Sequence, residues 1–364
     1  MEENVQKNIY DAPEVSTDSI KCKGCGGNMV FDPSTQKLKC PYCGYTEAFT
    51  TNEQVEERDL QDVLNKNESW KRDTSSFRCA NCGAKIHTEK SITATLCPFC
   101  GPSHVIKEDD LEGIKPNVVL PFKLTTENVA KNFKTWARKK IFAPNKFRKS
   151  ASTDKIKGVY MPFFTFDSNT ASVYEGRLGK RKTRTVRTKN GTTTETYTEW
   201  RRVSGSISHF FDDIYINAGD RLDSKQIYNL MPFDYSSSRV YDNAYLNGFY
   251  AHHYDKDIAA CWKEARDYMD KQLRQLILER NNCDYIDYLN VSTRHENVTF
   301  KYVLVPVYVI NYTYKKKNYT IYCNGNSGKF AGKTPVSPWK VAIASVVGLA
   351  AAIGLILLFM YLNN

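Results

Sequence analysis

Eight of the eleven cysteines follow one spacing pattern that occurs twice, and this pattern constrains the fold of the chain more than any other feature. The pattern consists of Cys22-x2-Cys25 with Cys40-x2-Cys43, and of Cys79-x2-Cys82 with Cys97-x2-Cys100. Two thiolates separated by two residues fit adjacent corners of a tetrahedral zinc site. A glycine follows the second cysteine of every pair, where a tight turn favours a residue that tolerates positive φ. The pattern therefore predicts two zinc ribbons, in residues 21–48 and 75–104.

The ligand set predicts a structural role for both sites. All four ligands of each site are cysteine, and such a site keeps no open position for water or substrate. We therefore expect two structural Zn²⁺ ions, which supply folding free energy to ribbons too small to have a core of their own.

Two other segments contain residue types found in catalytic sites, but neither has the pattern of one. Gly328–Thr334 resembles a phosphate-binding loop but has three residues between its glycines instead of four. Pro335 and Pro338 follow, and they are incompatible with the helix whose N-terminus would hold the phosphates. The His252–Asp255 segment is read as a polar loop before a helix, with a metal site as the alternative. We predict that the chain is not an enzyme.

The C-terminal stretch Val341–Leu362 contains 22 residues and no charge. At about 1.5 Å per residue it spans roughly 33 Å, which matches a bilayer core of about 30 Å. Lysines precede it and no charged residue follows, so the positive-inside rule places the N-terminal bulk in the cytoplasm. We expect a single-pass tail anchor in the cell membrane; a buried core helix is the alternative. The first residues, Met1–Asn4, do not resemble a signal peptide.

Small residues recur every four positions in this stretch, at Ala344, Gly348 and Ala352. Such a face lets a second membrane helix approach closely. The pattern favours association through the anchor, although small residues are also common in membrane helices in general.

The net charge of +11 is concentrated in two segments. Lys131–Lys149 contains eight basic and no acidic residues, and Arg177–Arg202 contains nine basic residues against Glu195 and Glu199. Asn190-Gly191 predicts a hairpin turn between the polar arms Lys180–Lys189 and Thr192–Trp200. This basic hairpin could bind nucleic acid, anionic lipid or an acidic protein, or simply remain solvated.

The rest of the pattern predicts an acidic tail in 1–20, a linker helix in 49–74, a cytoplasmic α+β domain in 105–330 with a mostly antiparallel sheet, and a juxtamembrane linker in 331–340. The linker helix is expected over Asn52–Trp70. Expected elements of the α+β domain are strands at 118–122 and 160–166, helices at 125–141 and 255–281, a central strand at 298–312 and a strand at 319–323. The basic helix at 125–141 could pack on the sheet or lie on a membrane surface. Cys261, Cys283 and Cys323 are expected to be core residues.

Several short motifs occur together with the two ribbons and the terminal apolar helix. They are Phe133-x2-Trp136, Gly158–Phe164, Met231–Asp234, Tyr245–Tyr250 and Asn324–Lys329. This combination resembles a family of bacterial membrane proteins labelled as transcription-factor-IIB-type zinc-ribbon proteins or as primosomal-helicase-like, and the resemblance covers nearly the whole chain. The resemblance implies a non-enzymatic membrane adaptor. It also implies a link to membrane-stress systems with phage-shock-protein-A-like and stomatin/flotillin-like partners.

Two functions follow as hypotheses. The first is a tail-anchored adaptor that recruits partner proteins to the cytoplasmic face of the membrane. The alternative is a membrane-tethered nucleic-acid-binding protein that uses the ribbons and the basic hairpin. Bases often stack on aromatic side chains beside basic residues, and the hairpin offers only Tyr197 and Trp200, so the adaptor is favoured.

Overall fold

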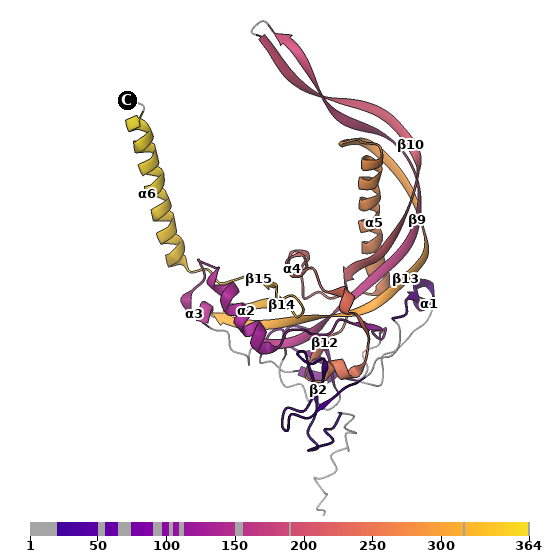
Figure 1. Ribbon diagram of the computed structural model, residues 1–364, viewed down its shortest axis with the longest axis vertical. Helices are drawn as coiled ribbons and strands as arrows, with labels where there is room; N and C mark the ends of the chain where they lie inside the picture. The colour runs from indigo at the N-terminus through magenta and orange to yellow at the C-terminus, as the bar shows by residue number, and fades with distance from the viewer. Residues whose placement is uncertain are drawn as a thin grey trace, which may run out of the picture.

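The computed structural model of the protein describes residues 20–49, 55–64, 74–89, 97–101, 105–108, 113–149, 156–188, 191–315 and 317–362. Nearly all of the predicted acidic tail, and Asn190 of the predicted hairpin turn, lie outside these residues. Long curved strands form the main sheet, and the helices α5 (Ile258–Arg280) and α6 (Pro338–Leu362) stand on one side of it in Figure 1.

Three long strands form the centre of the main sheet: β9 (Ile156–Thr188), β10 (Gly191–Asn217) and β13 (Tyr285–Tyr314). Successive side chains of a strand point to opposite faces, so β13 contributes to two cores. One core contains Val303, Val305, Val307 and Val309. The other contains Tyr302, Leu304, Tyr308 and Ile310. The prediction of a central strand with two apolar faces is confirmed.

The pairing is mostly antiparallel, as predicted, and two short strands pair in parallel with the long ones. These are β8 (Val118–Val119) beside β13 and β12 (Tyr250–His252) beside β9. The main path through the sheet is β11-β8-β13-β9-β12-β6-β5-β7; β10 pairs with β9, β4 and β14 pair with β13, and β15 pairs with β14. The bounds of these remaining strands are β4 Arg58–Asp59, β5 Thr74–Cys79, β6 Lys85–Glu89, β7 Val105–Glu108, β11 Arg239–Val240, β14 Lys317–Asn324 and β15 Phe330–Gly332.

Side-chain caps begin the two main helices of the body close to the predicted positions. The Thr125 hydroxyl accepts a hydrogen bond from the backbone N–H of Asn128 at the start of α2 (Thr126–Arg138). The Asp257 carboxylate accepts one from Ala260 at the start of α5. α2 buries Val129, Ala130, Phe133 and Ala137. The apolar face of α2 therefore packs inside the protein. Of the two alternatives for this helix, packing on the sheet applies, and the apolar face does not lie on a membrane surface. The shorter helices are α3 (Asn145–Lys149), α4 (Ser224–Leu230), η2 (Tyr235–Ser237) and η3 (Asn243–Leu246).

The predicted linker helix over Asn52–Trp70 is only partly confirmed in the residues that the structure describes. The helical part, α1, covers Leu60–Leu64, and Arg58–Asp59 before it form β4 against Thr299–Phe300 of β13. The Glu57 carboxylate lies 2.9 Å from the amine of Lys301. Contacts with β13 thus override the local helical pattern, as tertiary contacts commonly do.

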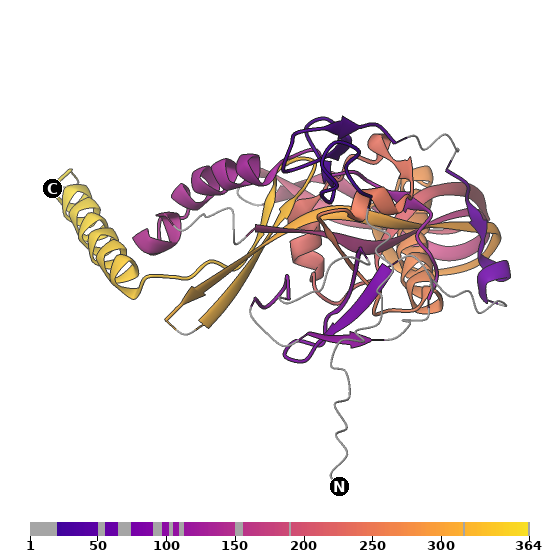
Figure 2. The same ribbon diagram turned by 90° about the horizontal axis from the view of Figure 1, so that it is seen from below.

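The two cysteine-bearing segments are joined to the body, one by strand pairing and the other by side-chain packing. β7, which the predicted boundary places in the body, pairs with β5 of the second segment, and β6 pairs with β12 of the body. The first segment forms a separate sheet from β1 (Val30–Asp32), β2 (Lys37–Lys39) and β3 (Thr46–Glu47). Its Phe31 nevertheless packs edge-on against Tyr245 and Phe249 of the body. Figure 2 shows the two segments, indigo and purple, on opposite sides of the long strands.

Beyond β13, the strands β9 and β10 continue together as a two-stranded arm (Lys180–Arg202), which projects from the body in Figure 1. The pairing of β13 with β9 ends where Tyr285 lies opposite Gly179. Further along β9, from Lys180 opposite Glu199 to Thr188 opposite Gly191, the described pairs are between β9 and β10. The predicted projecting hairpin is confirmed.

The C-terminal helix α6 begins three residues before the predicted stretch and has no buried residue. It is the one described helix that is long and apolar enough to cross a membrane. A core helix would be covered by other elements, so the alternative of a buried helix does not apply to α6.

Candidate metal centres

The first cysteine cluster is formed by the turn that precedes β1 and the turn that joins β2 to β3. The sulfur of Cys22 lies 3.4 Å from that of Cys43, and the sulfur of Cys25 lies 3.5 Å from that of Cys40. All four sulfurs lie within 4.8 Å of one another. Cys25 and Cys43 are exposed, whereas Cys22 and Cys40 are buried, so the cluster lies at the surface with one side against the protein.

The second cluster repeats this arrangement. The sulfur of Cys79 lies 3.6 Å from that of Cys100, and the sulfur of Cys82 lies 3.7 Å from that of Cys97. Cys79 and Cys97 are buried, and their partners are half-buried. This cluster is therefore more enclosed than the first.

Glycines and backbone hydrogen bonds shape the four turns. Gly26, Gly44, Gly83 and Gly101 have φ between 72° and 85°, which favours glycine. The N–H of Gly26 donates to the carbonyl of Cys22 at 2.8 Å, and Gly44, Gly83 and Gly101 make the same contact in their turns. Backbone N–H groups of Cys43 and Tyr42 lower the pKa of the Cys40 thiol to about 6. This favours the thiolate of Cys40, which is the form that binds metal, whereas, against the opposing effect of the Tyr45 N–H, the neighbouring thiols of Cys22 and Cys25 raise the pKa of Cys43.

The sulfur positions fit a tetrahedral metal ion. With metal–sulfur bonds of about 2.3 Å, a regular tetrahedron places its corners about 3.8 Å apart, close to the 3.4–3.7 Å observed. The structure thus brings the eight predicted cysteines together as two groups that could each hold a metal ion.

Polar contacts join the second cluster to the body. The Asn311 amide donates to the carbonyl of Pro98, inside the Cys97–Cys100 turn, at 2.8 Å. On the other side, His87 of β6 lies within hydrogen-bond distance of Ser76 (3.1 Å) and of His253 (2.9 Å). The two histidines are fully or almost fully buried. A displacement of this cluster would therefore disturb buried hydrogen bonds of the body.

Two acidic groups have donor atoms close enough for a metal, namely Asp220 with His252 and Asp255, and Asp167 with Asp212 and Asp213. A basic side chain forms ion pairs with each group. Arg221 lies 2.7 Å from Asp220, and Lys301 lies 2.8 Å from Asp213 and 3.5 Å from Asp167. We therefore assign these groups to the stability of the fold. His252 is the last residue of β12, and the predicted loop before α5 begins only after it. Burial lowers the pKa of His252 to about 3, so the imidazole is neutral.

The Lys301 cluster, which also includes Glu57, is a group that the sequence analysis missed. Its four members come from β13, the linker, β9 and β10. They are far apart in the sequence, so no local sequence motif predicts that they form a cluster.

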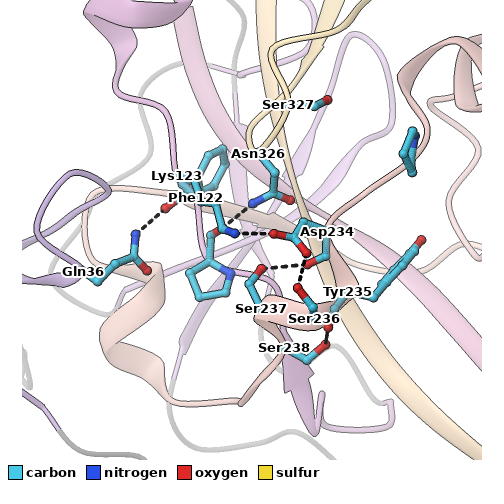
Figure 3. A network of polar contacts seen from close by, with 12 residues as sticks. Gln36, Phe122, Lys123, Asp234, Tyr235, Ser236, Ser237, Ser238, Asn326 and Ser327 are labelled. Atoms are coloured by element: carbon cyan, nitrogen blue, oxygen red, sulfur yellow. Dashed lines mark hydrogen bonds and ion pairs between the residues drawn. The ribbon is translucent and has the colours of Figure 1, made fainter.

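The segment that resembles a phosphate-binding loop, Gly328–Thr334, begins in the turn after β14 and contains β15. The Asn324 amide donates to the carbonyls of Leu230 and Pro232 at 2.9 and 3.1 Å, and Lys329 donates to that of Met231 at 2.8 Å. Lys123 pairs with Asp234, and Asn326 donates to the Pro121 carbonyl, as drawn in Figure 3. The motifs Met231–Asp234 and Asn324–Lys329 thus meet in one hydrogen-bonded network. Lys329 therefore contributes to the fold through its hydrogen bond to Met231. The next helix, α6, begins only at Pro338 and so does not follow the glycine-containing segment directly.

The basic arm is partly neutralised by its own residues. Lys182 pairs with Glu199 at 2.6 Å, and Arg184 pairs with Glu195 at 2.9 Å. The guanidinium groups of Arg184 and Arg177 lie over the rings of Tyr197 and Trp200, respectively. Neither aromatic ring therefore offers both of its faces to a base.

Comparison with known proteins identifies a relative of the chain. No family model and no solved structure matches. A protein of Bacillus subtilis (strain 168), described as the uncharacterized protein YdjG, is 28% identical over 243 residues, which cover 65% of this chain and 69% of that protein. This similarity identifies a relative and assigns no activity.

Proposed function

We propose that the protein is a membrane-anchored adaptor without catalytic activity, which recruits partner proteins to the cytoplasmic face of the cell membrane. The observation that carries the proposal is α6, whose apolar side chains are all left uncovered by the rest of the protein. A continuous apolar surface of this size is unfavourable in water and favourable in a bilayer. The lysines before the charge-free stretch favour a cytoplasmic body.

In this proposal each cysteine cluster holds a structural Zn²⁺ ion. Four thiolate donors in tetrahedral arrangement favour zinc over magnesium or calcium, which prefer oxygen. The ion would complete the fold of each segment and take no part in a reaction.

The first cluster carries the surface that we propose for recruitment. Tyr42, in the Cys40–Cys43 turn, is 80% exposed, and Tyr45 next to that turn is 39% exposed. Tyrosine is enriched in protein interfaces, because it combines a large apolar area with a polar end. The cluster lies on the opposite side of the main sheet from the C-terminal end of α6 in Figure 1, where a cytoplasmic partner can reach it. Phage-shock-protein-A-like and stomatin/flotillin-like proteins are the candidate partners, by the family resemblance.

Crosslinking in cells, followed by purification of the full chain in detergent and mass spectrometry, tests the adaptor. We expect specific partner proteins with the parent chain, and their loss with Tyr42→Ser. Tyr228→Ser is the matched control, because Tyr228 of α4 is equally exposed. Recovery of nothing above background from the parent chain would contradict the proposal.

A second candidate function is nucleic-acid binding by the arm, which the exposed side chains of Arg181, Lys182, Arg184 and Arg187 favour. The ion pairs and covered rings described above weaken it. Binding through phosphates loses affinity steeply as salt rises. A gel-shift titration of the full chain in detergent decides the matter, since the absence of a shift at low salt excludes this function.

A further inference from the structure

We infer that the α2–α3 corner (Lys139–Lys146) is a lipid-contact surface, which places Ile141 and Phe142 in the bilayer interface and binds anionic headgroups through its lysines. The inference rests on the proposed function, because it requires α6 to cross a membrane. It adds a second point of contact with the bilayer to the anchor.

Aromatic packing fixes the corner on the end of the main sheet. Trp136 stacks on Phe330 of β15 with ring centroids 5.3 Å apart. Phe147 of α3 packs edge-on against Phe133 at 5.5 Å and against Tyr312 of β13 at 5.1 Å. The residues between these rings therefore have a defined position on the protein.

Hydrogen bonds tie the same corner to the first turn of α6. The Phe142 carbonyl accepts the backbone N–H of Ser337 at 2.8 Å. The Lys340 amine donates to the Ala143 carbonyl at 2.8 Å and to the Asn145 side chain at 2.9 Å. Figure 1 and Figure 2 show α2 and α3 beside this end of α6. The corner therefore lies at the level where α6 would enter a bilayer, whatever the tilt of the rest of the helix.

The apolar side chains at this level are exposed, unlike those of α2 itself. Ile141 is 64% exposed and Phe142 is 40% exposed, whereas Phe133 of α2 is 1% exposed. On the α6 side, Val336 and Trp339 are 55% and 74% exposed. Apolar and aromatic side chains around the entry point of a membrane helix favour the interface between headgroups and acyl chains.

The positive charge of the corner favours anionic lipids. The segment Asn128–Lys149 contains no acidic residue, and Lys139, Lys140 and Lys146 are exposed. Basic side chains near the membrane surface are attracted by anionic lipids of the cytoplasmic leaflet. An acidic protein would fit the charge as well, but the contact with the first turn of α6 favours lipid.

Photocrosslinking of the full chain in vesicles tests the inference. p-Benzoylphenylalanine is placed at Phe142, or at Ile141 as a second position, and lipid adducts are measured by mass spectrometry. The same group at Leu349, within α6, reports on the anchor, and at Tyr42 it reports on a surface in the first cluster. We expect adducts at Phe142, Ile141 and Leu349, and none at Tyr42. Adducts at Leu349 without any at Ile141 and Phe142 overturn the lipid-contact surface, whereas their absence at Leu349 overturns the anchor.

The role of charge is tested in vesicles of phosphatidylcholine with and without phosphatidylglycerol. We expect a several-fold higher adduct yield at Phe142 with phosphatidylglycerol, and loss of this gain in the double variant Lys139→Glu with Lys146→Glu. Lys37→Glu, an exposed position in the first cluster, should keep the gain. Equal yields in both vesicles would overturn the binding of anionic headgroups, and a protein adduct replacing the lipid adduct in cells would make the corner a partner-docking site instead.

Discussion

Lys301 lies on β13 with its side chain 12% exposed and three carboxylates around its amine, those of Glu57, Asp167 and Asp213. Lys301→Met removes the one cation of this group and leaves the buried Asp167 unpaired. Breaking a buried ion pair in this way costs about 3–5 kcal/mol. We expect a clear loss of stability in chemical unfolding of the detergent-solubilised chain. Lys225→Met, at an exposed position of α4, is the control and should change stability little.

Asp167 predicts a pH dependence at the same site. Burial raises the pKa of Asp167 to about 6, although Lys301 opposes this shift. The folded state therefore binds the proton more tightly than the unfolded state, where the pKa is near 3.8. Asp167 thus contributes a gain in stability as the pH falls through about 6 toward 4. Asp167→Asn should reduce this gain, measured by unfolding at several pH values, and Asp270→Asn on α5 should leave it unchanged.

The cysteine ligands predict a metal stoichiometry. Cys97→Ser removes one of four sulfur donors from the second cluster, so we expect bound zinc to fall from two ions per chain to one. Cys323→Ala also alters a fully buried cysteine, but it should keep both ions. Elemental analysis of the purified variants measures this. Two ions in Cys97→Ser would show that the second cluster is not a zinc site.

At the scale of elements, α6 carries the prediction that its small residues form an interface. A side chain built at Gly348 meets no atom within 4 Å, so Gly348→Leu leaves the described contacts intact while it fills the Ala344–Ala352 face. We expect the variant to insert normally and to associate less strongly in a membrane two-hybrid assay. Unchanged association would mean that α6 acts only as a tether.

Elements with strong local signals could be predicted from the sequence. Apolar spacing located α2 and α5, and alternation of apolar residues located the central part of β13. The cysteine spacing located all eight candidate ligands, because ligand and turn residues are close in sequence.

Elements that depend on distant partners could not be predicted. The linker helix was expected to include the segment around Glu57. Instead, Arg58–Asp59 form a strand that pairs with β13, and Glu57 forms an ion pair with Lys301. β9 and β13 continue far beyond their apolar runs because they pair with each other along most of their length. The helix expected over 125–141 includes Ile141, but α2 ends at Arg138 and leaves Ile141 exposed.

At the scale of the whole molecule, the two cysteine clusters support opposite faces of the main sheet. The first cluster shares a core with Phe122 and Tyr308, and the second shares the other core with Val303 and Val307. If the two cysteine segments were independent modules, their cysteines would not share cores with the strands of the main sheet. Metal ions bound by these clusters would therefore stabilise the entire body and not only the cysteine segments.

This arrangement predicts the result of metal removal. Structural zinc contributes about 10–16 kcal/mol of binding free energy to small zinc domains, and here both sites contact the central core. Treatment of the full chain in detergent with a chelator should therefore make the long strands β9 and β13 susceptible to protease, together with the cysteine segments. Limited proteolysis with peptide mapping measures this, and the chain with zinc restored is the control. If a protease-resistant fragment covering residues 113–330 survives chelation, the body folds without the metal and the two clusters are independent modules.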